Sequence, residues 1–388
     1  MRRGSEAPGM AYFDNNATTR PCEVAQAAYS EALSEDWRNP SAPSSAAARV
    51  RVKLDLAREK LAACLGVSPD TVSFTSGATE SNNAVFSHIS RHASPHARVL
   101  LSPVEHPSVR ESASRYFSGR VDELPADGSG IVDPSTLAPA LDATEVALVS
   151  VMAANNETGV IQPWEQIAGI CRVHGVPFHS DATQWLGKLP ARQFDACDYL
   201  SASAHKFGGL KGVGLLKAPV EVSFIVGGEQ EGGRRAGTEN FPGVAAMLAA
   251  LEEADSFGET PTLEQARDAF EESLRASIPS VDVLGKNIPR LWNVSALLMP
   301  RFDNLRWVGK LEKIGHEVST GSACATGKDG PSHVSAAMGL SPEQARRVVR
   351  VSGSRETTPA EWSGLADAFR LAYAELQADS SSSEVVSI

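Results

Sequence analysis

The stretch Ser-Ala-Ser-Ala-His-Lys-Phe-Gly-Gly, residues 201–209, joins a β-prone run to a histidine, a lysine and two glycines. A lysine at a strand end that faces a cleft is well placed to form an imine, because desolvation or nearby cations make its amine nucleophilic toward carbonyls. Pyridoxal 5'-phosphate (PLP) is the cofactor that uses such an imine. The alternative for Lys206 is a surface lysine beside a turn. The rest of a PLP site must therefore be sought elsewhere in the chain.

A second motif offers a place for the phosphate group of PLP. Residues 72–83, Val-Ser-Phe-Thr-Ser-Gly-Ala-Thr-Glu-Ser-Asn-Asn, indicate a short strand, a turn through Gly77 and a helix that begins with small hydroxyl residues. Backbone N–H groups at a helix N-terminus, together with the hydroxyl of Thr79, suit a phosphate. The same pattern is also typical of an ordinary Ser/Thr helix cap without a ligand.

Two further segments offer partners for the pyridine ring. Asp181 follows an apolar run in Val-Pro-Phe-His-Ser-Asp-Ala-Thr-Gln, residues 176–184, and a carboxylate there would keep the ring nitrogen protonated, so that the ring acts as an electron sink. An aspartate that caps a following helix is the alternative. His106 follows the predicted strand at residues 98–102, and an imidazole can stack on the ring and move protons near neutral pH. A single histidine is more often structural.

These segments occur in one chain order, and together with further motifs they make the sequence similar to a known family. It resembles the NifS/IscS-type cysteine desulfurases of the class V aminotransferase superfamily, which have PLP fold type I. The motifs that carry the resemblance are Tyr-Phe-Asp-Asn-Asn-Ala-Thr-Thr (12–19), Thr-Ser-Gly-Ala-Thr-Glu-Ser-Asn-Asn (75–83), Glu-His-Pro (105–107), Asn-Asn-Glu-Thr-Gly (155–159), His-Ser-Asp-Ala-Thr-Gln (179–184), Ser-Ala-His-Lys (203–206), Arg-Arg-Ala-Gly-Thr-Glu-Asn (234–240), Ser-Thr-Gly-Ser-Ala-Cys (319–324) and Arg-Val-Ser-Gly-Ser-Arg (350–355). They extend over nearly the whole chain.

The resemblance implies roles for individual side chains. Lys206 would form the imine with PLP, Asp181 would pair with the pyridine nitrogen, and His106 would stack on the ring and relay protons. The other cofactor contacts that it implies are Gln184 and Asn156 at the phenolic oxygen, Ala78, Thr79, Ser203 and His205 at the phosphate, and Thr238 at the phosphate of the other subunit of a homodimer. Arg350, with Asn156, would bind the substrate carboxylate, a task that suits a bidentate guanidinium.

Cys324 lies in Ser-Thr-Gly-Ser-Ala-Cys-Ala-Thr-Gly-Lys-Asp-Gly, residues 319–330, a stretch too rich in glycine and small residues for a packed helix. Flexibility suits the implied chemistry. A thiolate attacks the γ-sulfur of L-cysteine and becomes a persulfide, and L-alanine is released. The persulfide then carries the sulfur to an acceptor. No stable metal site is expected because no cysteine pair has CxxC spacing, and Cys324 is at most a transient iron–sulfur ligand. Cys64 and Cys171 lie in helix-like apolar patterns and are expected to be buried.

The chain is expected to divide into two domains. Short β-rich runs alternate with helical stretches, which predicts an α/β fold with a mainly parallel sheet flanked by helices. These runs are residues 72–74, 98–102, 147–152, 177–180, 198–202 and 212–217. The resemblance implies seven strands in the large domain, residues 14–256, and a smaller α+β domain from residues 1–13 and 257–378 that carries the catalytic cysteine loop. The Ser-rich residues 379–388 are expected to be a disordered tail.

Composition restricts the partners and the location. The net charge of −11 over 388 residues argues against a general nucleic-acid or membrane surface. No apolar run is long enough to cross a bilayer, and the N-terminal Met-Arg-Arg-Gly-Ser-Glu is not followed by an apolar core. Five cysteines without a pairing pattern fit a reducing compartment. We therefore expect a cytoplasmic enzyme that binds neither nucleic acid nor membrane directly.

Two alternatives and the sulfur acceptor stay open at this stage. A selenocysteine lyase or a small-substrate aminotransferase could use the same pocket, although an aminotransferase needs no thiol such as Cys324. A catalytically idle docking subunit is the other alternative, against which the presence of every site residue argues. Residues 376–388 do not resemble the region by which housekeeping members engage an iron–sulfur scaffold. The acceptor therefore stays open between a sulfur-acceptor protein, namely an iron–sulfur scaffold or a tRNA or DNA thio-modification enzyme, and a small metabolite into which the sulfur is inserted.

Overall fold

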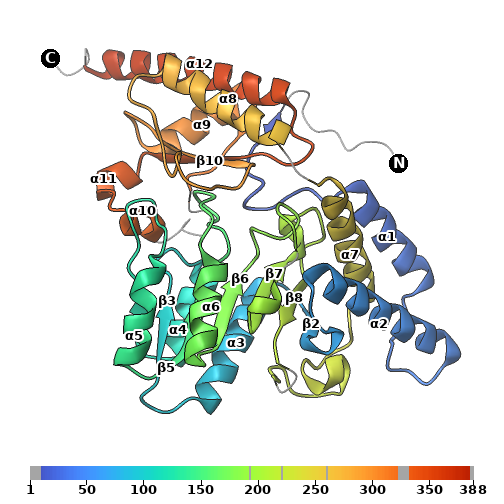
Figure 1. Ribbon diagram of the computed structural model, residues 1–388. Coiled ribbons are helices and arrows are strands. Elements are labelled where there is room, and N and C mark those ends of the chain that lie inside the picture. The colour runs from blue at the N-terminus through green and yellow to red at the C-terminus, as the bar shows by residue number, and fades with distance from the viewer. Residues whose placement is uncertain (1–9, 192–193, 220–221, 259–260, 322–331, 385–388) are drawn as a thin grey trace.

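The computed structural model describes residues 10–191, 194–219, 222–258, 261–321 and 332–384, and Figure 1 shows their arrangement. A large α/β part is built on one seven-stranded sheet, and a smaller part with its own sheet and the long C-terminal helix lies beside it. The two parts meet at the loops that follow the strands of the large sheet (Figure 1). Ligands of open α/β sheets bind at this edge, so it is the place to look for a functional site.

The large sheet has the strand order β2-β8-β7-β6-β5-β3-β4. Its members are β2 (Val72–Thr75), β3 (Arg98–Leu101), β4 (Val121–Glu123), β5 (Val146–Ser150), β6 (Phe178–Asp181), β7 (Tyr199–Ser203) and β8 (Gly214–Lys217). Strand β8 runs antiparallel to β2 and β7, and the other neighbours are parallel. The predicted mainly parallel, seven-stranded sheet is therefore confirmed.

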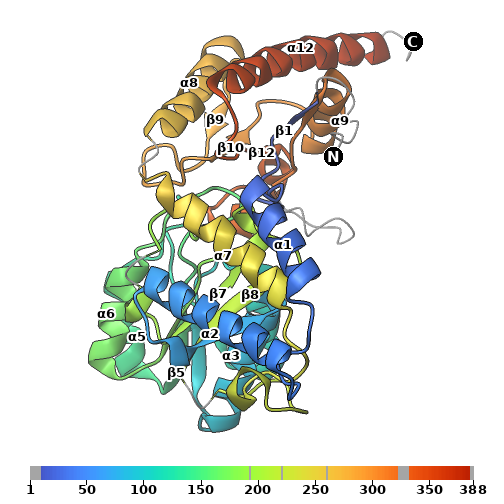
Figure 2. The same cartoon turned by 90° about the vertical axis from the view of Figure 1, so that its right-hand side faces the viewer.

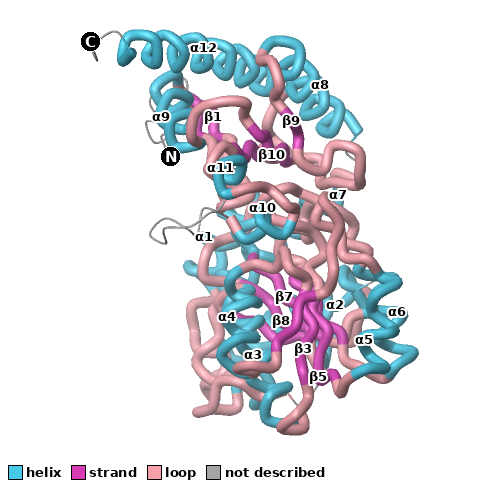
Figure 3. Tube along the Cα trace, turned by 90° about the vertical axis from the view of Figure 1, so that its left-hand side faces the viewer, coloured by secondary structure: helices cyan, strands magenta, loops and turns pink. Residues whose placement is uncertain are grey.

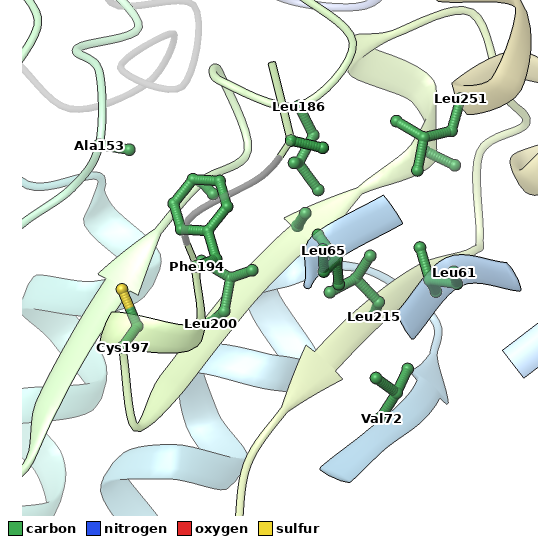
Figure 4. Close-up of a cluster of buried hydrophobic side chains, with 14 of the residues drawn as sticks. Leu61, Leu65, Val72, Ala153, Leu186, Phe194, Cys197, Leu200, Leu215 and Leu251 are labelled. Atoms are coloured by element: carbon green, nitrogen blue, oxygen red, sulfur yellow. The ribbon is translucent and has the colours of Figure 1, made fainter. Parts of the chain in front are cut away.

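Helices cover both faces of this sheet (Figure 3). They are α1 (Glu23–Glu35), α2 (Ser45–Leu65), α3 (Ala78–His92), α4 (Pro107–Tyr116), α5 (Leu137–Ala143), α6 (Trp164–His174) and α7 (Phe241–Ser256). Alternate strand residues point to opposite faces. Leu200 and Leu215 accordingly pack with α2, α6 and α7 (Figure 4), whereas Tyr199 and Leu216 pack with α3 and α4. Both faces are thus buried, as parallel sheets require.

The smaller part has an antiparallel sheet of order β12-β10-β9. Its elements are β9 (Asp282–Val283), β10 (Val294–Leu298) and β12 (Val348–Ser352), with α8 (Pro261–Ser277), α9 (Asn304–Ile314), α10 (His333–Ala337), α11 (Pro342–Ala345) and α12 (Pro359–Glu384). Figure 2 shows α8, α9 and α12 beside this sheet. A core with Phe270, Trp307 and Phe369 joins these helices to it. Strand β1 (Ala11–Tyr12) pairs in parallel with β11 (His316–Glu317), so the N-terminal segment packs here too.

Two local predictions are wrong. Residues 379–388 were expected to be disordered, but residues 379–384 continue α12, and Lys310 on α9 pairs with Glu375 at 3.1 Å and Asp379 at 3.0 Å. Residues 385–388 of this prediction lie outside the described residues. The preceding Ala- and Leu-rich turns propagate the helix, and each further residue adds a backbone hydrogen bond. Cys171 is buried as predicted, but Cys64 on α2 is only partly buried. Among the described helices, none has both the length and the apolarity needed to span a bilayer.

Candidate active site

The lysine of the opening motif lies where β7 ends. Strand β7 is paired with β6 in the register Asp181 to Ser201, and the chain then turns into the short helix Ala204–Lys206. A glycine is needed at position 209, because a Cβ there would lie 2.7 Å from the Cβ of Ala204. The Nζ atom of Lys206 donates to two backbone oxygens in the segment that follows β1, those of Asn16 at 2.7 Å and Ala17 at 2.8 Å. The amine therefore lies at the carboxyl edge of the sheet.

The turn between β2 and α3 forms a cradle beside this lysine's strand. Gly77 has φ 151°, a conformation that side chains rarely adopt, and the hydroxyl of Ser203 accepts a 2.7 Å hydrogen bond from the N–H of Ala78. Gly214 on β8 packs so closely that a Cβ would lie 2.5 Å from the Cα of Gly77. Thr79 is exposed in the first turn of α3. The cradle joins a serine hydroxyl to the N-terminus of a fifteen-residue helix, a donor set that suits a phosphate.

Asp181 ends β6 as a buried carboxylate. Its side chain is 4% exposed, and it accepts hydrogen bonds from the N–H of Thr183 at 2.9 Å and from Nδ2 of Asn82 at 3.0 Å. Burial, and next the charge of Asp181, raise the pKa of the neighbouring Glu105 well above its usual value. Both hydrogen-bond donors to Asp181 are neutral, so a protonated pyridine nitrogen would supply the positive charge that this buried carboxylate calls for.

His106 is the N-cap of α4, and its ring is fixed by the next turn. Its Nδ1 accepts from the N–H of Ser108 at 3.1 Å and lies 2.8 Å from the hydroxyl of the same serine. Burial lowers the pKa of His106 below its usual 6.5; the charge of Asp181 opposes this shift and that of Lys206 adds to it. The imidazole is therefore neutral at pH 7, a form that suits stacking and proton transfer.

His205, beside the lysine, is also a neutral ring. Its Nδ1 lies 3.2 Å from the hydroxyl of Thr18, and burial, with the charges of Lys206 and two further lysines, lowers the pKa of His205 to about 4. At this position it can act on an anion only as a neutral hydrogen-bond donor. The electrostatic attraction for a phosphate must then come from the helix N-terminus and the lysines.

Gln184 and Asn156 lie in the same site, where the side-chain amide of Gln184 and the backbone oxygen of Asn156 already have partners. The Nε2 atom of Gln184 donates to the backbone oxygen of Asn16 at 3.0 Å, and its Oε1 accepts from the amine of Lys188. Burial, and then the charges of Lys206 and Arg350, lower the pKa of Lys188 well below its usual value. Lys188 was not among the residues expected from the sequence, although its spacing of four residues from Gln184 was an available signal.

Arg350 on β12 brings the smaller part of the fold into the site. Its side chain is 2% exposed, and it donates to Asp14 at 2.6 Å, to the hydroxyl of Ser319 at 3.1 Å and to the backbone oxygens of Asn156 at 3.1 Å and Gly321 at 3.0 Å. Asp14, which holds this guanidinium, was not among the residues expected from the sequence. A substrate carboxylate would have to replace Asp14 or share the arginine with it.

Thr238 lies apart from this group. It is exposed in the loop of residues 227–240, where the described structure gives its hydroxyl no contact with the residues above. Cys324 lies outside the described residues. The structure brings together the other expected residues, which lie on or directly beside β6, β7, β12, α3, α4 and the segment after β5: Ala78, Thr79, His106, Asn156, Asp181, Gln184, Ser203, His205, Lys206 and Arg350.

This fold and this site define a PLP-dependent enzyme of fold type I, because the cradle, the buried carboxylate and the strand-end lysine match the cofactor's phosphate, ring nitrogen and carbonyl. The family described as Aminotransferase class-V matches residues 11–363, and the chain belongs to this family. The resemblance seen in the sequence is thereby confirmed.

The chain is also similar to individual proteins that have been named or solved. The chain is 38% identical over 360 residues to a cysteine desulfurase of Cereibacter sphaeroides, an alignment that covers 90% of this chain and 92% of the relative. A solved NifS-like protein superposes with a TM-score of 0.86 at 31% identity, over 94% of this chain and 99% of that one. A solved structure of SspA in complex with cysteine superposes with a TM-score of 0.77 at 29% identity, over 88% and 98% of the two chains.

Proposed function

We propose that this chain is a PLP-dependent cysteine desulfurase that converts L-cysteine to L-alanine and carries the released sulfur as a persulfide on Cys324. The observation that supports it best is the pairing of β6 with β7, because β6 ends at the buried carboxylate of Asp181 and β7 leads into the short helix that carries Lys206. The relative from Cereibacter sphaeroides is named a cysteine desulfurase, and the SspA structure contains cysteine. Both names support L-cysteine as the substrate.

The residues divide the work of holding the cofactor. The N–H groups at the start of α3, with Thr79, Ser203 and His205, hold the phosphate, and Asp181 keeps the ring nitrogen protonated. His106 stacks on the ring, while Gln184 and Asn156 face the phenolic oxygen. Bound in this way, PLP supplies an electron sink that lowers the barrier to removing the α-proton of an amino acid.

The side chains then act on the substrate in turn. Arg350 exchanges Asp14 for the carboxylate of L-cysteine, and Nζ of Lys206, released from the backbone oxygens that it now contacts, takes the α-proton. The thiolate of Cys324 attacks the γ-sulfur, and the carbon–sulfur bond breaks with its electron pair on carbon. That carbon takes up the proton that the thiol of Cys324 gave up, relayed by His106, and Lys206 returns a proton to the α-carbon. The products are L-alanine and a persulfide on Cys324, so atoms and electrons balance.

A homodimer and a protein acceptor complete the proposal. Val226 and Ile225, at the start of the glycine-rich loop that carries Thr238, are 88% and 37% exposed, and Trp37 is 65% exposed. Such apolar side chains are stabilised by burial at a subunit contact, from which Thr238 reaches the phosphate of the other subunit. The persulfide passes to a sulfur-acceptor protein, either an iron–sulfur scaffold or a thio-modification enzyme, in the reducing cytoplasm.

Borohydride trapping tests the first requirement of this function, an imine between PLP and Lys206. Wild-type protein purified with PLP should show a visible absorbance band that borohydride bleaches, with the reduced cofactor found by mass spectrometry on the peptide that contains Lys206. Lys206→Ala should lose both signals and the conversion of L-cysteine to alanine. Lys211→Ala, an exposed lysine five residues on, is the matched control and should keep all three. Normal turnover by Lys206→Ala, or a label on another lysine, would refute the proposal.

A further inference from the structure

Two side chains that no step above uses connect His106 to Asp181. Asn82 on α3 is completely buried, and its Nδ2 lies 3.0 Å from Oδ2 of Asp181 and 2.9 Å from the hydroxyl of Ser108. That hydroxyl lies 2.8 Å from Nδ1 of His106. The chain of contacts therefore runs from β6 through α3 to the first turn of α4, and it joins the two groups that flank the cofactor ring.

The direction of each hydrogen bond in this chain is determined by its donors. The backbone N–H of Ser108 can only donate, and it points at Nδ1 of His106 at 3.1 Å, so Nδ1 is an unprotonated acceptor. The Ser108 hydroxyl accepts from Asn82, so its own hydrogen is available for the same Nδ1. Because a neutral imidazole carries one proton, that proton is on Nε2 of His106.

The orientation of Asn82 is fixed by the carboxylate. A carboxylate can only accept, so the NH2 group of Asn82 must face Asp181, and its two hydrogens go to Asp181 and to Ser108. The opposite atom, Oδ1 of Asn82, is buried without a hydrogen-bond partner among the described residues. An unpartnered buried oxygen is unfavourable. The reversed amide is less favourable still, because it would place this oxygen against the carboxylate of Asp181.

We propose that Asn82 and Ser108 are positioning residues that hold His106 as its Nε2–H tautomer and make this arrangement depend on the carboxylate of Asp181. The proposal rests on the proposed function, in which His106 supplies a proton beside the cofactor ring. A ring with its proton on Nε2 can donate from that atom only, while Nδ1 is shielded by two donors. The negative charge of Asp181 keeps Asn82 in place. One hydrogen-bond network therefore orients both Asp181, the partner of the ring nitrogen, and His106, the proton donor.

The electrostatics of His106 agree with this geometry. Besides Asp181, the charges that act on its ring are those of Lys206, His333 from α10 and Glu111 from α4, and burial is the largest influence on its lowered pKa. Two hydrogen bonds donated to Nδ1 stabilise the neutral ring further, because protonation there would break both. Substitution of Asn82 or Ser108 leaves all four charged neighbours unchanged.

Nuclear magnetic resonance of the PLP-loaded protein, with isotope-labelled histidine nitrogens, tests the tautomer without any turnover. His106 is assigned by the signals that vanish in His106→Gln. The wild type should show a single Nε2–H tautomer. Ser108→Ala should raise the titration midpoint of His106 by about half a unit or more, the effect of one lost hydrogen bond to the neutral ring. Asn82→Leu should raise this titration midpoint too. The midpoint of the double variant should be little higher than that of either single variant.

Control variants separate positioning from general damage. Ser108→Thr keeps the hydroxyl and should restore the wild-type midpoint, and Ser112→Ala removes another buried serine of α4 and should change nothing. In assays with L-cysteine, Ser108→Ala should lower kcat and shift the acid limb of its pH profile upward, with KM unchanged. An unshifted midpoint in both Ser108→Ala and Asn82→Leu, or an Nδ1–H tautomer in the wild type, would overturn the proposal. The resonance experiment decides this even if L-cysteine proves not to be the substrate.

Discussion

Asparagine at position 181 removes the charge of Asp181 with the least change in shape, so Asp181→Asn tests the partner of the ring nitrogen. The carboxylate accepts one hydrogen bond on each oxygen, from the N–H of Thr183 at 2.9 Å and from Nδ2 of Asn82 at 3.0 Å. An asparagine offers one acceptor oxygen and one NH2 group, so one of these buried donors must lose its acceptor. We expect the free energy of unfolding to fall by about 1–3 kcal/mol.

The loss in catalysis should be at least as large. Two unit charges about 4 Å apart attract by about 4 kcal/mol at an effective dielectric constant of about 20, and the substitution removes this attraction from the protonated ring nitrogen. If about two thirds of it acts in the transition state of α-proton removal, the barrier rises by roughly 2.7 kcal/mol, which is about a hundredfold in rate.

The assay for Asp181→Asn is exchange of the substrate α-proton with heavy water, followed by magnetic resonance, because this step precedes any sulfur transfer. Urea unfolding measures the stability change separately. Ser180→Ala is the matched control: Ser180 is the preceding residue of β6, fully buried, and its hydroxyl has no hydrogen-bond partner among the described residues. The control should exchange at the wild-type rate. An unchanged exchange rate in Asp181→Asn would mean that Asp181 only caps the turn at Thr183.

Two predictions concern stability. Burial lowers the pKa of His179 from 6.5 to about 4, so the unfolded chain binds a proton that the folded chain does not, and stability should fall by up to about 3 kcal/mol as the pH falls from about 6.5 to 4. His179→Gln should flatten this part of the urea-midpoint profile, and an equally steep profile would contradict the assignment. Gly159 has φ 76°, and a Cβ there would lie 2.1 Å from Val294, so Gly159→Ala should cost more than about 2 kcal/mol in urea unfolding. Gly169→Ala, inside α6 with open space around it, should instead gain about 0.5–1 kcal/mol, and equal effects at the two sites would contradict the packing.

The sequence predicted those parts of the fold that local patterns determine. Six of the seven large-sheet strands coincide with short β-rich runs, because buried strands need continuous apolar side chains. The missed strand, β4, has only three residues, Val121–Glu123, two of them acidic, and lies at the sheet edge. A pattern so short and polar carries no strand signal. Asp181 and Lys206 could be placed at strand ends because each follows its own strand directly in the sequence.

The parts of the site that depend on distant contacts could not be predicted. Asp14 and Arg350 are 336 residues apart, and only the packing of β12 beside the N-terminal segment makes them an ion pair. In the sequence, Lys188 is an ordinary lysine after a glycine. Only the structure shows that it is buried and hydrogen-bonded to Gln184. Asn82 likewise lies in a motif that predicts a phosphate-binding site. Its side chain instead contacts Asp181, the partner proposed for the ring nitrogen. Periodicity carries no information on such pairings.

The most direct test of the central claim locates the sulfur after one turnover. Mass spectrometry of wild-type protein treated with L-cysteine and a persulfide-trapping reagent should find the extra sulfur on the peptide that contains Cys324. Burial raises the pKa of Cys22 to about 11 and that of Cys171 to about 12, so these thiols are poor nucleophiles. Cys324→Ser should still give the spectral change of L-cysteine binding but no persulfide. Extra sulfur on Cys22, Cys64, Cys171 or Cys197, or undiminished desulfuration by Cys324→Ser, would contradict the account.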